Sequence, residues 1–103
     1  MKIQHDGDTL RASAIAELSA SNANWFRDEA RHAFGQQQRN IEIDLSQTMA
    51  LDSCGLGALV ALHKTASARG GVLRLRNPTP PVEQILELTR MHRIFEVVKD
   101  QAP

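Results

Sequence analysis

The chain has 103 residues, 42% of them hydrophobic and 23% charged, the balance of an ordinary soluble globular protein with one domain over residues 1–103. Twelve basic residues balance twelve acidic ones, so no net charge draws it to nucleic acid or anionic lipid, and neither is expected as a partner. No apolar run approaches the ~18 residues that span a bilayer. The N-terminus lacks the apolar core of a signal peptide, and the single cysteine cannot form an intrachain disulfide, which together favour a cytoplasmic protein.

The first third of the chain predicts a hairpin followed by a helix. Residues 2–5 and 9–15 have the pattern of two strands, and an Asp-Gly step between them is a hairpin signal. Apolar residues then recur at helical spacing. Ser21 or Asn22 can cap this helix and Gly35 can end it. The apolar stripe consists of Phe26, Ala30, Ala33 and Phe34.

The remainder of the chain alternates strands and helices. Residues 40–46 alternate apolar and acidic side chains, which predicts a strand with two unlike faces. A helical pattern runs from Ser53 to about Arg69, residues 72–76 predict another strand, and Thr79 can cap a third helix. The third helix is expected to bury Val82, Ile85, Leu86 and Met91, and a last strand is expected over 94–98. This order predicts an α/β domain with a mixed sheet of four to five strands flanked by helices, and at least one parallel pair across a helical crossover.

The most apolar run of the chain, residues 49–62, has a polar centre. Asp52, Ser53 and Cys54 follow a predicted strand and loop, which puts them at the start of a helix. One interpretation is structural: Asp52 or Ser53 caps the helix, while Gly55 and Gly57 allow close packing onto the sheet. The other is functional, because a hydroxyl at a helix start is exposed enough for a kinase to reach.

A phosphate on Ser53 would add about −1.5 to −2 charges. The helix dipole tolerates negative charge at this end, so the fold would survive. A partner packed over the helix start would not tolerate it, because Asp52 is already there and apolar Leu51 and Leu56 would line the contact. Phosphorylation of Ser53 would therefore preserve the fold but abolish binding of the partner, as a binding switch requires.

Catalytic and cofactor-binding patterns do not fit this segment. A nucleophile elbow needs glycine where Leu51 stands, a dinucleotide fingerprint needs a further glycine at Val60, and a phosphate loop needs a G-K-[ST] step. The four histidines have no partners at ligand spacing, so neither a metal nor a cofactor is expected. Cys54 is either an activated thiol at a helix N-terminus or a small apolar residue.

Three segments resemble the STAS domain of bacterial anti-sigma factor antagonists. They are IDLS at 43–46, LDSCGLGAL at 51–59 and GGVLRL at 70–75, and D-S-x-G-L-G is the most specific feature. The resemblance spans nearly the whole chain. It implies a small sheet flanked by helices, with Ser53 as the phosphoacceptor.

The resemblance also implies the partners. The unphosphorylated form would capture an anti-sigma factor that is also an ATP-dependent Ser/Thr kinase, and so release the sigma factor. The kinase would then inactivate the antagonist by phosphorylation, and a metal-dependent Ser phosphatase would reset it. The chain would be a ligand and a substrate rather than an enzyme. The expected partner-binding residues are Ser19, Ser21, Leu51, Asp52, Ser53, Cys54, Gly55 and Leu56.

The chain departs from the family pattern at a few positions. Ala16 and Ser19 replace the outer residues of a Gly-Glu-Leu-Asp segment, which removes a carboxylate near the switch. Arg90 stands where a helix-ending glycine is usual, so the third helix is expected to end differently. Cys54 replaces a common Ser or Thr after the acceptor, and leaves the acceptor itself in place.

Two further alternatives stay open from the sequence. Some STAS proteins are small subunits of an ABC transporter ATPase in lipid transport, although their segment is usually D-T-G-G-L rather than D-S-C-G-L-G. Trp25 lies off the apolar stripe of the first helix, where it either contacts a partner or covers the edge of the core.

Overall fold

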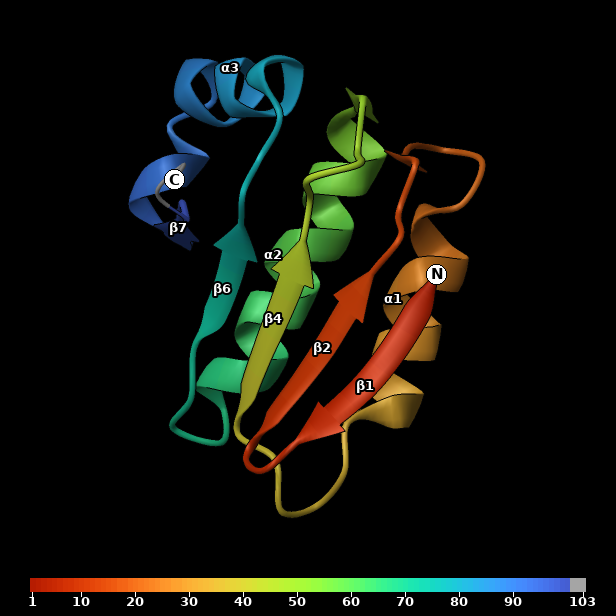
Figure 1. Ribbon diagram of the computed structural model, residues 1–103, viewed down its shortest axis with the longest axis vertical. Coiled ribbons are helices and arrows are strands. Elements are labelled where there is room, and N and C mark those ends of the chain that lie inside the picture. Colours follow the sequence, from red (N-terminus) through yellow and green to blue (C-terminus); the bar gives the residue numbers. More distant parts are fainter. Residues whose placement is uncertain (101–103) are drawn as a thin grey trace.

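The computed structural model describes residues 1–100, and a five-stranded mixed sheet forms its centre (Figure 1). The strand order is β1-β2-β4-β6-β7. Only the first pair is antiparallel, which confirms the predicted hairpin, and the other three pairs are parallel. The strands are β1 (Lys2–Asp6), β2 (Thr9–Ser13), β4 (Asn40–Asp44), β6 (Leu73–Arg76) and β7 (Glu96–Val98). The predicted α/β class with a mixed sheet is therefore confirmed.

Helices provide the crossovers between the parallel strands. They are α1 (Ala23–Ala33), α2 (Ser53–Ser67) and α3 (Pro80–Leu88), followed by a 3-10 turn, η1 (Met91–Arg93). In Figure 1, α1 and α2 lie together behind the sheet, while the front of the sheet carries no helix. The two faces therefore have different environments, in agreement with the strand pattern of residues 40–46.

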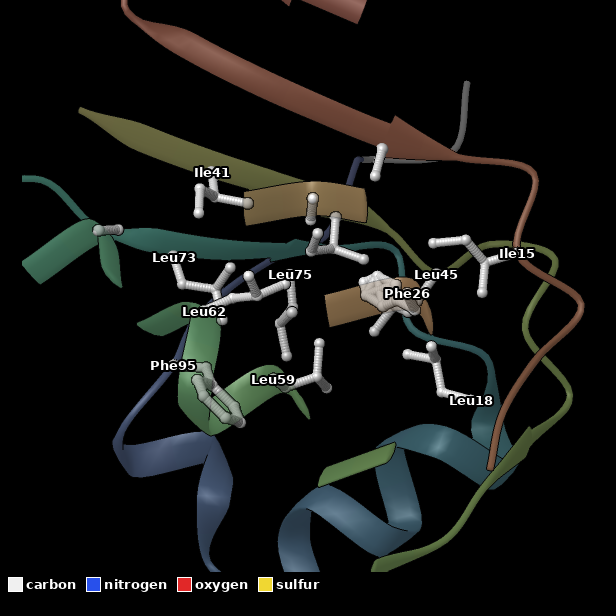
Figure 2. Close-up of a cluster of buried hydrophobic side chains, with 14 of the residues drawn as sticks. Ile15, Leu18, Phe26, Ile41, Leu45, Leu59, Leu62, Leu73, Leu75 and Phe95 are labelled. Carbon is white, nitrogen blue, oxygen red and sulfur yellow. The ribbon is translucent and has the colours of Figure 1, made fainter. Parts of the chain in front are cut away.

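The core lies between the sheet and α1 and α2. Strand residues such as Ile41, Leu73 and Leu75 meet Phe26 of α1 and Leu62 of α2 (Figure 2), and all five are almost completely buried. Burial of each such side chain stabilises the fold by about 1.5–3 kcal/mol. Most residues predicted for the two helical stripes belong to this buried cluster, whereas Ala33, Ile85 and Met91 are only partly buried against it.

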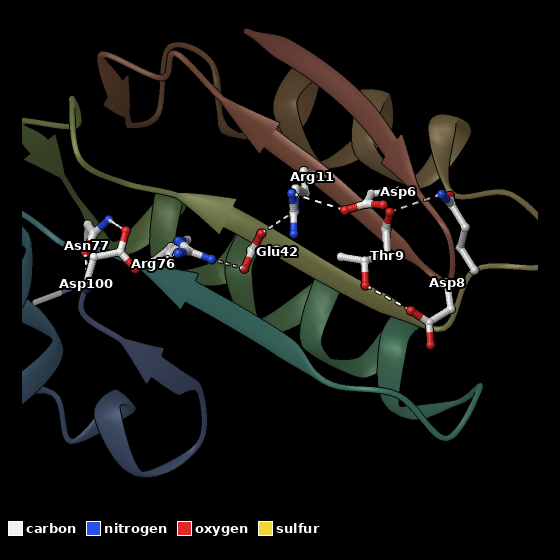
Figure 3. Close-up of polar contacts among 9 residues, drawn as sticks. Asp6, Asp8, Thr9, Arg11, Glu42, Arg76, Asn77 and Asp100 are labelled. Carbon is white, nitrogen blue, oxygen red and sulfur yellow. Dashed lines mark hydrogen bonds and ion pairs between the residues drawn. The ribbon is translucent and has the colours of Figure 1, made fainter.

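An ion-pair network crosses the open face of the sheet. Glu42 of β4 is only 4% exposed, although the alternating pattern of its strand predicted a less buried position. Its carboxylate forms ion pairs with Arg11 Nε at 2.6 Å and Arg76 Nη1 at 3.1 Å (Figure 3). Arg76 also forms an ion pair with Asp100 at 2.5 Å. The two guanidinium groups cover the carboxylate and satisfy both of its oxygens, which is why a charge can be buried here.

Several element ends differ from the predictions. Strand β2 ends at Ser13 because Ala14 adopts a left-handed conformation, with φ of 58°. Helix α3 ends at Leu88 and does not reach Met91, which lies in η1. Arg90 was expected to change the end of this helix, but it adopts the left-handed conformation usual for a helix-ending glycine, with φ of 60°.

The residues predicted to begin and end the helices are only partly those that do so in the structure. Asn22 and Thr79 occupy the N-cap positions of α1 and α3, but neither side chain bonds to its own helix. The Thr79 hydroxyl instead donates to the carbonyl of Thr48. Helix α1 terminates through Phe34 rather than Gly35, while Gly70 does stop α2, with φ of 75°.

Candidate functional site

A second, two-stranded sheet positions the start of α2, and the sequence did not predict it. Strand β3 (Glu17–Leu18) pairs in parallel with β5 (Ala50–Leu51). The Asp52 N–H also donates to the carbonyl of Leu18 at 3.1 Å, which continues the pairing into the helix start. These bonds bring the loop before α1 against the first turn of α2.

Asp52 links this loop to the helix. It is the N-cap of α2, and its carboxylate accepts a hydrogen bond from the Gly55 N–H at 3.0 Å. Its other oxygen accepts from the Ala20 N–H at 2.9 Å. The bond from Gly55, followed by that from Ala20, lowers the pKa of the Asp52 carboxyl from its usual value, so it is ionised at neutral pH.

Ser53 and Cys54 are the first two residues of α2, and both are exposed. The cap is therefore supplied by Asp52, which leaves the Ser53 side chain free of that task. Cys54 is a free thiol. The structure thus separates the two roles that the sequence left open: Asp52 caps the helix, and Ser53 faces solvent.

The structure corrects the expectation that Leu51 and Gly55 line a contact surface, because both are buried. A Cβ on Gly55 would lie 2.2 Å from the Leu18 carbonyl oxygen and 2.8 Å from the Leu51 side chain. Leu51 and Gly55 therefore pack the start of α2 against β3. Leu56 is half-buried against the core, and the position of Gly57 is open to solvent. Close packing thus applies to Gly55 but not to Gly57.

Ser19 and Ser21 lie in the loop that Asp52 holds. Their hydroxyl groups are 2.8 Å apart. Asn22 orders the same loop, since its side chain accepts from the Ser19 N–H at 2.9 Å and donates to the Glu17 carbonyl at 2.7 Å. The structure thus brings the predicted residues of both segments to one end of the molecule.

Sequence reasoning missed the backbone N–H of Ala20 and the loop-ordering role of Asn22. A backbone donor carries no residue-type signal, so only the fold reveals it. It also missed Met49, which is 62% exposed beside this site.

Within residues 1–100, no helix has the length and apolar character needed to cross a membrane. Within the same residues, His, Cys, Asp and Glu side chains nowhere gather in threes as potential metal ligands.

The fold and the site define a small α/β domain that presents a serine at the start of a helix, beside an ordered loop. The model of the STAS domain family matches residues 1–102. The chain therefore belongs to the STAS domain family.

Curated relatives agree with this assignment. A Thermotoga maritima protein named "Putative anti-sigma factor antagonist" is 34% identical over 82 residues, which cover 79% of this chain and 73% of that protein. An anti-sigma F factor antagonist from Paenibacillus polymyxa is 22% identical over 102 residues, with coverage of 98% and 87%.

Solved structures share the fold. A crystal structure of a "putative anti-sigma factor antagonist" from Thermotoga maritima superposes with a TM-score of 0.83 at 27% identity, and the match covers 97% of this chain and 86% of that one. The anti-sigma factor antagonist SpoIIAA in its unphosphorylated form gives a TM-score of 0.83 at 18% identity, with coverage of 97% and 87%. At that identity the second likeness concerns the fold alone.

Proposed function

We propose that this protein is an anti-sigma factor antagonist that binds its anti-sigma factor while Ser53 is unphosphorylated. The observation that carries the proposal is the exposed Ser53 at the N-terminus of α2, next to a carboxylate that joins the helix to the loop of Ser19 and Ser21. The names of the relatives support the same class of function.

Electrostatics explains how a phosphate on Ser53 would act. Phosphorylation adds about −1.5 to −2 charges beside Asp52, whose lowered pKa keeps its carboxylate ionised. The N-terminus of α2 favours negative charge, so the fold tolerates the modification. A partner packed over the helix start would have to desolvate both charges, and its affinity falls.

The proposed cycle needs two enzymes besides this chain. The anti-sigma factor acts as the ATP-dependent Ser/Thr kinase, and a Ser phosphatase restores the binding form. This protein is then a ligand and a substrate with no catalytic role. Because such enzymes meet sigma factors in the cytoplasm, we propose the same location for this chain.

The test is a pull-down from the native host, read by mass spectrometry, with wild-type and Ser53→Asp proteins as baits. The wild type is expected to capture an ATP-binding protein with a kinase fold, and Ser53→Asp to lose it. Ser53→Ala should bind but resist inactivation by ATP. Ser67→Asp is the matched control, since it adds the same charge to an exposed serine at the other end of α2.

Two outcomes of the pull-down would contradict the proposal. Equal capture of an ABC transporter ATPase by the wild type and Ser53→Asp would identify a transporter subunit and overturn the proposal. Equal capture of a kinase by both baits would show that Ser53 does not control binding.

A further inference from the structure

A groove of about 270 Å³ lies between strand β3 and the start of helix α1. Three of its residues, Glu17, Leu18 and Asn22, belong to the strand and loop that the α2 start holds in place. Strand β3 therefore borders the groove and also pairs with β5, the strand that leads into α2. The residues that line it are Met1, Ala14, Ile15, Ala16, Glu17, Leu18, Asn22, Trp25 and Phe26.

Large apolar side chains are exposed around this groove. Trp25, on its wall, is 53% exposed, and Met1 is 38% exposed. Met49 is close by, because its N–H donates to the carbonyl of Ala16, another groove residue. Exposed aromatic residues beside a pocket are typical of the centres of protein interfaces.

The rim of the groove also carries a carboxylate, Glu17, which accepts a hydrogen bond from the Ser19 hydroxyl at 3.4 Å. Glu17 is exposed, and within residues 1–100 no Lys or Arg lies in ion-pair distance of its carboxylate. By contrast, Glu42 is paired on the open face of the sheet. A cationic group from outside would complement Glu17.

We propose that this groove receives one apolar side chain of the anti-sigma factor, flanked by a lysine or arginine that pairs with Glu17. The inference rests on the proposed function and names the surface that supplies affinity. The volume of about 270 Å³ lies near the lower end of the range for binding pockets, and a single apolar side chain fits it. The groove anchors the partner, and Ser53 at the neighbouring helix start controls whether the rest of the partner can close onto α2.

Trp25 is the only tryptophan in the chain, so it can report directly on the groove. The probe is the purified kinase-fold protein captured by the wild-type bait. Fluorotryptophan incorporated at Trp25 gives a fluorine NMR signal. The tryptophans of the unlabelled partner carry no fluorine and do not contribute to it. The signal is expected to shift when the kinase is added to the wild type, and to stay unchanged with Ser53→Asp.

Affinity measurements provide a second readout. Trp25→Ala is expected to weaken kinase binding roughly tenfold or more, and Glu17→Lys to weaken it most at low salt. Leu88→Ala is the matched control, because Leu88 is 76% exposed on α3, outside the groove, and should change affinity less than about twofold. Circular dichroism checks that each variant is folded.

The outcomes separate the two proposals. If Trp25→Ala binds the kinase like the wild type while Ser53→Asp loses it, the groove assignment is wrong and the proposed function stands. If Ser53→Asp also binds like the wild type, the proposed function fails, and the inference fails with it. A fluorine signal that shifts with the concentration of this chain alone would show a second copy in the groove and overturn the proposal.

Discussion

The carboxylate of Asp52 accepts a hydrogen bond from the backbone N–H of Ala20, 32 positions earlier in the chain, at 2.9 Å. The same side chain caps α2 through Gly55. One carboxylate therefore holds the loop of Ser19 and Ser21 against the helix that presents Ser53. This relationship makes the site a single surface rather than two separate segments.

Replacement of Asp52 by Asn should lower stability at neutral pH and change its dependence on pH. The folded-state pKa of Asp52 lies below its usual 3.8, so the unfolded chain binds more protons between the two values. The stabilising contribution is therefore complete above about pH 5 and is lost as the pH falls through the folded-state value. Melting temperatures of both proteins from neutral pH to about pH 2 measure this effect.

The difference in melting temperature between the wild type and Asp52→Asn should become smaller at acidic pH. Asp100 also has a lowered pKa, through Asn77 and Arg76, but it is present in both proteins and cancels in the comparison. A gap that stays constant down to the lowest pH would show that the charge of Asp52 does not contribute.

Two glycines of α2 should respond in opposite ways to alanine. Gly55→Ala should destabilise the protein by about 2 kcal/mol or more, because the added Cβ would lie 2.2 Å from the Leu18 carbonyl oxygen. Gly57→Ala meets no atom within 4 Å and should stabilise the helix by roughly 0.5–1 kcal/mol. Urea unfolding measures both, and a loss of stability in Gly57→Ala would contradict the open position.

Loss of the two arginines that pair with buried Glu42 should lower the stability of the protein more than loss of the Glu42 charge itself. Glu42→Gln keeps the volume and leaves the two arginines partly in solvent, with exposed side-chain fractions of 44% and 34%. The double variant Arg11→Met, Arg76→Met instead leaves an unpaired carboxylate that is 5% exposed. Urea unfolding midpoints should therefore fall further for the double variant than for Glu42→Gln; the reverse order would show that the guanidinium groups do not compensate this charge.

Arg90 should be replaceable by glycine with a gain in stability. Its φ of 60° costs an L-residue about 1–2 kcal/mol, of which the greater freedom of glycine in the unfolded chain offsets about 0.4–1 kcal/mol. Arg90→Gly should thus raise stability by up to about 1.5 kcal/mol. Arg90→Ala is the control, since it removes the side chain but keeps the strain. Equal thermal midpoints for the two variants would exclude relief of backbone strain.

Much of the architecture followed from local patterns. Alternation in residues 40–46 predicted β4, and the Asp-Gly step predicted the hairpin of β1 and β2. These signals are local because side chains in strands alternate between faces, while those in helices recur every three to four residues. The start of α2 at Ser53 followed from the same change of period together with a capping residue.

The composition of the candidate site was decided by the tertiary structure. Strands β3 and β5 have two residues each, too few to show a period, and their pairing joins distant segments. The Ala20 donor is a backbone group, and the groove beside Trp25 exists only where β3 and α1 meet. Local patterns therefore predicted the strands of the main sheet and the three helices, but not β3 or β5, and the family resemblance pointed to Ser53 as the candidate acceptor. The tertiary structure decided which side chains share its surface, because contacts between distant residues depend on register and packing.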